Sequence, residues 1–148
     1  MIELVNVTKE YDNGTLALEN VNLQIENGEF VFSVGSSGAG KTTITKLLMR
    51  EENVTSGEVF LNGEDISKIS DKEIPYLRRK MGVVFQDFRL LEDRTVFENV
   101  EFAMRVVGAS KREIRRRVPV VLNMVGLNYK AKMLPKETTN SDMPAIRK

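Results

Sequence analysis

A glycine-rich segment of eight residues constrains this chain more than any other feature of its sequence. Residues 35–42 read Gly-Ser-Ser-Gly-Ala-Gly-Lys-Thr and match the Walker A pattern G-x-x-x-x-G-K-[ST] at every fixed position. Glycine lets the backbone turn so closely that successive N–H groups point inward at an anion, and the pattern requires a strand before it and a helix after it. The segment therefore predicts an α/β fold built around a phosphate-binding loop.

Each residue of this loop has an expected role in holding a nucleoside triphosphate. Lys41 is expected to reach the β and γ phosphates, and the Thr42 hydroxyl is expected to bind Mg²⁺. Thr43 adds a hydroxyl for the α phosphate. The main chain of the other loop residues is expected to surround the phosphates, and these are Gly35, Ser36, Ser37, Gly38, Ala39 and Gly40. The following helix offers its positive end to the anion, so Mg-ATP or a similar nucleotide is the predicted ligand.

The sequence before the loop predicts short strands. Alternating apolar residues over 2–7 and 21–25, then a dense apolar run over 30–34, indicate an antiparallel meander whose last strand enters the loop. Asn-Gly pairs at positions 13 and 27 mark tight turns. The run over 30–34 is apolar enough to be a central, buried strand. These flanking patterns disfavour the alternative that the glycine-rich segment is a chance match.

The sequence after the loop predicts mainly helices. Ser110 with Glu113 forms a capping box, and Pro119 lies inside the helix that follows, which it is expected to kink or loosen. The predicted elements are a helix over 42–49, a strand over 57–61, a polar helix with Pro75 early in it, a second buried strand over 81–86, and helices over 95–107 and from Ser110 to Leu122.

The composition excludes several classes of chemistry. The 148 residues contain no cysteine and no histidine, which excludes disulfides, thiolate metal sites and histidine bases. The 22 basic and 21 acidic residues give a net charge of +1, so we predict no nucleic-acid partner. No stretch approaches the ~18 apolar residues that a membrane span requires. We therefore expect a soluble chain that reaches a membrane only through a partner.

With these features together, the sequence resembles the nucleotide-binding subunits of ABC transporters. More than thirty residues of predicted meander precede the loop, Tyr11 resembles the adenine-stacking aromatic of that family, and Gln86 resembles its Q-loop glutamine. The resemblance covers residues 1 to about 134 and is most specific over residues 87–95. It implies that Tyr11 stacks on the base and that Gln86 binds Mg²⁺ or positions the attacking water. An ordinary surface tyrosine and a solvated glutamine are the alternatives.

Within the family, residues 77–91, 114–118 and 125–127 resemble members that act in cell division. The resemblance implies an ATP hydrolase that forms a homodimer, lies peripherally on the cytoplasmic face of the membrane, and links ATP turnover to peptidoglycan cleavage through an integral membrane subunit. By analogy, Phe88, Leu90 and Leu91 line the groove that accepts this subunit. The alternative is that these three residues pack inside the helical part of the chain.

Three motifs of the family are missing from the sequence. Beyond residue 134 there is no Leu-Ser-Gly-Gly signature, no apolar strand ending in Asp-Glu and no switch histidine. We therefore expect residues 1–134 to form a partial ATP-binding domain of a truncated or frame-shifted product, with 135–148 as a divergent, disordered tail. Efficient hydrolysis is not expected, and the apolar runs over 30–34 and 83–85 would be undercovered. The alternative function is a non-catalytic fragment that binds nucleotide or a partner; the lack of an Asn-Lys-x-Asp motif disfavours a GTPase.

Overall fold

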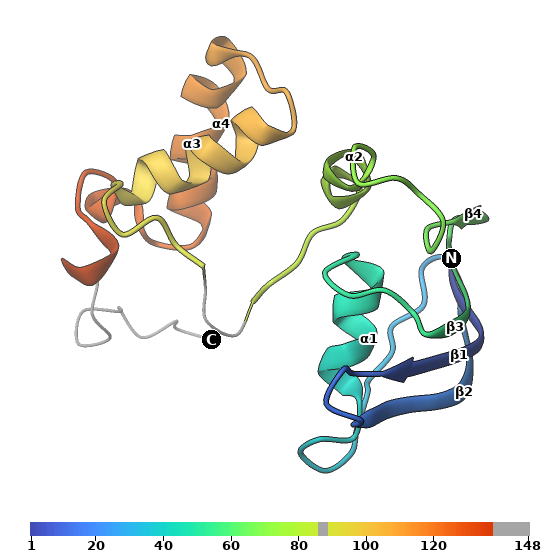
Figure 1. Ribbon diagram of the computed structural model, residues 1–148. Helices are drawn as coiled ribbons and strands as arrows, with labels where there is room; N and C mark the ends of the chain where they lie inside the picture. The colour runs from blue at the N-terminus through green and yellow to red at the C-terminus, as the bar shows by residue number, and fades with distance from the viewer. Residues whose placement is uncertain (86–88, 138–148) are drawn as a thin grey trace. The chain divides into compact units, whose positions relative to one another are not determined.

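The computed structural model of the chain describes residues 1–85 and 89–137. Its contacts divide the chain into two units, Met1–Gly82 and Val83–Lys148. In Figure 1 the first unit runs from blue to green and the second from yellow to red. The first unit contains the glycine-rich loop, and the second contains two longer helices.

An antiparallel sheet of four strands organises the first unit. Its strands are β1 (Ile2–Glu10), β2 (Leu16–Ile25), β3 (Ser56–Leu61) and β4 (Glu64–Asp65), and their order is β2-β1-β3-β4. Leu4 lies opposite Leu23 of β2 and Val59 of β3. The pairing of β1 with β2 shifts register between Leu4 and Val7, which lets two residues three positions apart both be buried. The predicted antiparallel strands over 2–7, 21–25 and 57–61 are confirmed.

Two helices complete the core of the first unit. Helix α1 (Lys41–Leu48) lies beside the sheet, and α2 (Ile74–Arg79) contains Pro75 in its first turn (Figure 1). The buried core consists of Leu4, Val7, Leu18, Leu47, Val59, Ile66 and Leu77. The side chain of Arg78 donates hydrogen bonds to the carbonyl oxygens of Met49 at 2.8 Å and Arg50 at 3.2 Å, so α2 caps the end of α1. The predicted helix over 42–49 is confirmed, with its start one residue earlier.

The prediction of buried strands over 30–34 and 81–86 is wrong. Residues 30–34 have no regular structure, and Phe30, Phe32 and Val34 are 81%, 78% and 89% exposed. The described part of the second segment, residues 81–85, is also irregular, and Val84 is 95% exposed. A strand needs a hydrogen-bonded neighbour, and neither segment has one within the described residues. The expectation of undercovered apolar runs is confirmed for residues 30–34 and for Val84, whereas Val83 and Phe85 are partly buried.

Two helices that pack against each other form the core of the second unit. Helix α3 (Val96–Val106) begins after Thr95 and helix α4 (Lys111–Met124) begins after Ser110, and both residues form capping boxes. The sequence predicts both helices and the box at Ser110, but not the box at Thr95. Ile114, Val118 and Leu122 form the buried side of α4, at the spacing of one helical face. They pack against Val96, Phe97, Val100, Met104, Ala109, Leu127 and Ala131. Pro119 lies inside α4 on its exposed side; the predicted kink stays a prediction.

Two short 3₁₀ turns follow α4, namely η1 (Asn128–Lys130) and η2 (Pro135–Glu137). Residues 138–148 lie outside the described residues, so the predicted disorder of the tail stays a prediction. Over the ranges that the structure does describe, none of the helices combines the length and the apolar character needed to cross a bilayer.

Acidification is expected to weaken the helical unit through its two capping boxes. Hydrogen bonds from the backbone N–H and the hydroxyl of Thr95 hold the pKa of Glu98 below its ordinary value of 4.5. Ser110 lowers the pKa of Glu113 in the same way. A carboxyl whose pKa is lower in the folded chain stabilises the fold fully above its ordinary pKa, and this contribution is lost as the pH falls through the lowered value. Urea unfolding followed by helical circular dichroism at about pH 6 and about pH 3 measures the loss.

The matched control is the double variant Glu98→Gln and Glu113→Gln, which keeps an acceptor at each cap but does not titrate. Its stability is expected to change less between the two pH values than that of the unmodified chain. An equal change in both proteins would show that the capping boxes are not the source of the pH dependence.

Candidate functional site

The glycine-rich loop ends at the N-terminus of α1, where the backbone is arranged to accept an anion. Gly40 is the N-cap residue, with φ 79° and ψ −3°, and no side chain caps the helix. The first turn contains no acidic residue. The first N–H groups of a helix lack acceptors within the helix, so this end has a partial positive charge. Neither a capping side chain nor a first-turn carboxylate neutralises that charge.

The ammonium group of Lys41 lies within the loop. Its Nζ donates hydrogen bonds to the carbonyl oxygens of Gly35 and Ser36, both at 2.7 Å. An ammonium has three N–H bonds, so one remains for a further acceptor. Lys41 is also the first residue of α1, and its charge and the helix end therefore attract the same anion.

Close packing of the main chain gives the loop its compact shape. A Cβ on Gly40 would lie 2.6 Å from the carbonyl oxygen of Ala17 and 2.7 Å from Cδ2 of Leu18. A Cβ on Gly35 would lie 3.1 Å from Cβ of Ala39. The loop therefore presents main-chain groups rather than bulky side chains to a ligand, which fits a triphosphate held by backbone amides.

Two predicted site residues that are distant in sequence lie in contact. The hydroxyl groups of Tyr11 and Thr43 are 3.2 Å apart, within hydrogen-bond distance. Tyr11 follows the last residue of β1, and Thr43 is buried in the first turn of α1. The predicted base platform and the predicted phosphate loop are therefore joined through one hydrogen bond.

The remaining predicted site residues make few contacts that bear on their predicted roles. Ser36, Ser37, Gly38 and Thr42 are exposed around the start of α1, and the N–H of Ala39 donates to the carbonyl oxygen of Ser36 at 3.2 Å. Gln86 lies outside the described residues. The roles of Thr42 and Gln86 as Mg²⁺ ligands stay predictions.

Sequence reasoning missed two lysines beside Tyr11 and the carboxylate that pairs with one of them. Nζ of Lys9 lies 4.9 Å from the centroid of the Tyr11 ring, and Nζ of Lys46 lies 5.8 Å from it. Lys9 also forms an ion pair with Glu52 at 2.9 Å. A signal for Lys9 was available, because it stands two positions before Tyr11 in the sequence, near the end of β1. Glu52 gives no such signal, because it is distant from Lys9 in the sequence and only the tertiary structure brings the two side chains together.

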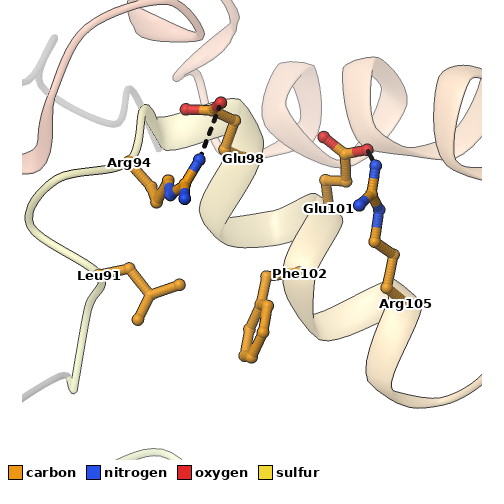
Figure 2. Close-up of a pocket in the computed structure, with 6 residues that line it drawn as sticks. All are labelled: Leu91, Arg94, Glu98, Glu101, Phe102 and Arg105. Carbon is orange, nitrogen blue, oxygen red and sulfur yellow. Dashed lines mark hydrogen bonds and ion pairs between the residues drawn. The ribbon is translucent and has the colours of Figure 1, made fainter.

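A groove of about 340 Å³ lies beside α3 in the second unit (Figure 2). Its apolar lining is Leu91 and Phe102. Its charged lining forms two ion pairs: Arg94, which precedes α3, with Glu98 at 3.9 Å, and Arg105 with Glu101, both in α3, at 2.6 Å. In Figure 2 the Leu91 side chain points toward Phe102, and the ring of Phe102 points away from the two ion pairs. Leu91 lines this groove, and the predicted docking of a membrane subunit there stays a prediction. Leu90 is exposed outside that lining, and Phe88 lies outside the described residues.

Asn99 fixes one wall of this groove. Its Oδ1 accepts a hydrogen bond from the N–H of Leu91 at 2.8 Å, and its Nδ2 donates to the carbonyl oxygen of Leu91 at 3.0 Å. Nδ2 also lies 3.1 Å from the carbonyl oxygen of Arg94. The segment that precedes α3 is therefore tied to the helix by one amide side chain, which gives the groove a defined shape.

Comparison with known proteins decides the family. A family model described as "ABC transporter" matches residues 18–143. This chain belongs to the ABC transporter family. The chain is 47% identical to the "Cell division ATP-binding protein FtsE" of Bacillus subtilis, over 99% of this chain and 64% of that protein. It is 40% identical to the protein of the same name from Escherichia coli K12, over 99% of this chain and 66% of that protein.

Solved structures of ABC proteins have the same fold. The ATP-binding cassette MJ0796, in a dimeric post-hydrolysis state bound to ADP and Pi, matches 94% of this chain with a TM-score of 0.85 and 37% identity. The protein cbiO1 from Clostridium perfringens, part of the transporter complex cbiONQ, matches 90% with a TM-score of 0.76 and 28% identity. The ABC-type fold and the family resemblance that the sequence predicts are confirmed.

The chain corresponds to part of an ABC ATP-binding protein. It spans 64% of the length of the Bacillus subtilis relative and 63% of that of MJ0796. The family match reaches residue 143, and the alignment with the Bacillus subtilis relative covers 146 residues. The division of the chain at residue 134 stays a prediction.

Proposed function

We propose that this chain is the nucleotide-binding part of an ABC-type ATP-binding subunit that acts in cell division and binds Mg-ATP. The observation that supports it most is the uncapped N-terminus of α1, with the Lys41 ammonium held beside it by Gly35 and Ser36. The relatives from Bacillus subtilis and Escherichia coli are named as cell-division ATP-binding proteins, which supports the biological role.

In this proposal each group of the loop has one task. The free N–H bond of Lys41 and the first amides of α1 hold the β and γ phosphates. The Thr42 hydroxyl and the phosphate oxygens hold Mg²⁺, which neutralises phosphate charge when it is bound. Tyr11 stacks on the base, and Gln86 positions the attacking water or adds a ligand to the metal.

We expect this chain to bind nucleotide without efficient turnover. Its 148 residues contain no Leu-Ser-Gly-Gly signature, no Asp-Glu after an apolar strand and no histidine. Such groups stabilise the transferring phosphoryl group and polarise the attacking water. Equilibrium binding of Mg-ATP and release of inorganic phosphate should both be measured on the purified chain. Binding without release supports a binding fragment, and release that requires Lys41 supports a hydrolase; absence of binding in a folded sample contradicts the proposal.

We also propose that the intact subunit pairs with a second copy and with an FtsX-like integral membrane subunit. It would then lie peripherally on the cytoplasmic face of the membrane. MJ0796 is dimeric, and cbiO1 belongs to a transporter complex, which supports an assembly of this type. The groove beside α3 suits a short helix from the membrane subunit, because its apolar floor is rimmed by charged pairs.

Changing Phe102 to aspartate is expected to weaken binding of the FtsX-like subunit about 30-fold, because an aromatic anchor in a groove contributes strongly to an interface. The measurement is binding to that subunit reconstituted in liposomes. Val107→Asp is the matched control, since Val107 is the C-cap residue of α3, is exposed and does not line the groove. Equal effects of the two variants would exclude the groove as the docking site.

A further inference from the structure

Lys9 is an unusual lysine because most of its side chain is buried. The side chain is 11% exposed, and its ammonium forms an ion pair with Glu52, which is 30% exposed, at 2.9 Å. Burial of a charged group is unfavourable unless the group is paired, so the ion pair fixes where the ammonium lies. That position is 4.9 Å from the centroid of the Tyr11 ring, a cation–π distance.

The ion pair connects two elements that bound the proposed nucleotide site. Lys9 lies near the end of β1, one residue before the strand ends. Glu52 follows α1, and its N–H donates to the carbonyl oxygen of Lys46 at 3.4 Å. Thr55 adds three contacts to the same strand end. Its Oγ1 accepts from the N–H of Glu10 at 2.9 Å and donates to the carbonyl oxygen of Glu10 at 3.3 Å, and its N–H donates to the carbonyl oxygen of Thr8 at 2.9 Å. The end of β1 is therefore fixed to the segment after the loop helix.

Tyr11 is held from several directions by these elements. Its hydroxyl contacts Thr43 at 3.2 Å, and Lys9 and Lys46 lie over its ring. Its backbone is also fixed, because its N–H donates to the carbonyl oxygen of Thr15 at 3.0 Å and its carbonyl oxygen accepts from the N–H of Gly14 at 2.8 Å. An aromatic ring that is already ordered loses less conformational entropy when a flat base stacks on it.

We propose that Lys9, fixed by Glu52, is a positioning residue that orders the Tyr11 ring as a platform for the purine base of the nucleotide. This inference rests on the proposed function, since it assigns the base half of the same site. Lys9 does not touch the phosphates in this arrangement; it acts through Tyr11. Its effect should therefore depend on whether the ligand has a base.

The test compares two ligands, Mg-ATP and magnesium tripolyphosphate, by titration calorimetry. The double variant Lys9→Met and Glu52→Gln removes the ammonium without leaving a buried charge unpaired. It is expected to bind Mg-ATP about five-fold more weakly while its affinity for tripolyphosphate stays within about two-fold. Lys9→Arg, which keeps the cation and the ion pair, is expected to restore the affinity for Mg-ATP.

A second readout separates positioning of the ring from general stability. The adenine proton resonances of bound ATP should move upfield through the ring current of Tyr11, and the shift should be smaller in the double variant. Tyr11→Ala in the double variant should weaken binding further by less than it does in the unmodified chain.

Equal weakening for both ligands, or no weakening for Mg-ATP, overturns the inference. If the unmodified chain binds both ligands equally well, phosphate binding stands and the base platform does not. If a folded, unmodified chain binds neither ligand, the proposed function fails and this inference fails with it.

Discussion

Replacing Lys41 with alanine is expected to weaken binding of Mg-ATP by about 3 kcal/mol, or ~100-fold or more. The ammonium is held beside the start of α1 by the carbonyl oxygens of Gly35 and Ser36, and one N–H bond remains for a phosphate. The substitution removes a charge-assisted hydrogen bond to the phosphate, and the carbonyl oxygens of Gly35 and Ser36 then accept hydrogen bonds from water instead. Binding is measured by calorimetry, with urea unfolding to show that stability is preserved.

The matched control is Lys72→Ala, which removes the same charge from an exposed position before α2. It is expected to change the affinity by less than about two-fold, because exposed charges interact weakly through water. Similar losses in both variants would mean that net charge, rather than the contact made by Lys41, determines binding.

Replacing Gly40 with alanine is expected to reduce the stability of the first unit by about 3 kcal/mol and to abolish nucleotide binding. Gly40 has a φ of 79°, and an added Cβ would lie 2.6 Å from the carbonyl oxygen of Ala17 and 2.7 Å from Cδ2 of Leu18. The left-handed backbone and the steric overlap both oppose the substitution. Relief of the overlap would move the loop away from β2 and displace the amides at the start of α1. Urea unfolding measures the change in stability.

The variant Gly38→Ala separates the effect of the left-handed backbone from the effect of the steric overlap. Gly38 has a similar φ of 84°, but no atom lies within 4 Å of an added Cβ. Only the backbone strain remains, so the expected loss is about 1 kcal/mol. Equal losses at the two positions would show that the contact of Gly40 with β2 does not matter.

Local sequence signals predicted the parts of the fold whose causes are local. The predicted capping box of Ser110 and Glu113 lies where helix α4 begins, and α3 begins after Thr95, the first residue of the helix predicted over 95–107. The helix after the loop and the hairpin strands also follow from periodicity and turn residues. The runs over 30–34 and 81–86 were predicted wrongly for a physical reason. An apolar run becomes a strand only when a neighbouring strand accepts its hydrogen bonds, and the composition of the run does not supply that neighbour.

The candidate site combines residues that are adjacent in the sequence with residues that only the fold brings together. The loop residues are adjacent in the sequence, so their motif alone indicated that Lys41 and Gly40 belong together. The contact between Tyr11 and Thr43, and the ion pair of Lys9 with Glu52, join residues that only the pairing of β1 and the position of α1 bring together. Such contacts depend on tertiary structure, and no local pattern predicts them.

In the proposed function, the main-chain amides at the start of α1 bind the phosphates of a nucleotide. The most direct measurement is a titration of the isotope-labelled chain with millimolar Mg-ATP, in which the amide resonances of residues 38–42 are followed by NMR. We predict saturable shifts of these resonances, and much smaller shifts in the Lys41→Ala variant. Loop resonances that do not move in a well-folded sample would contradict the claim.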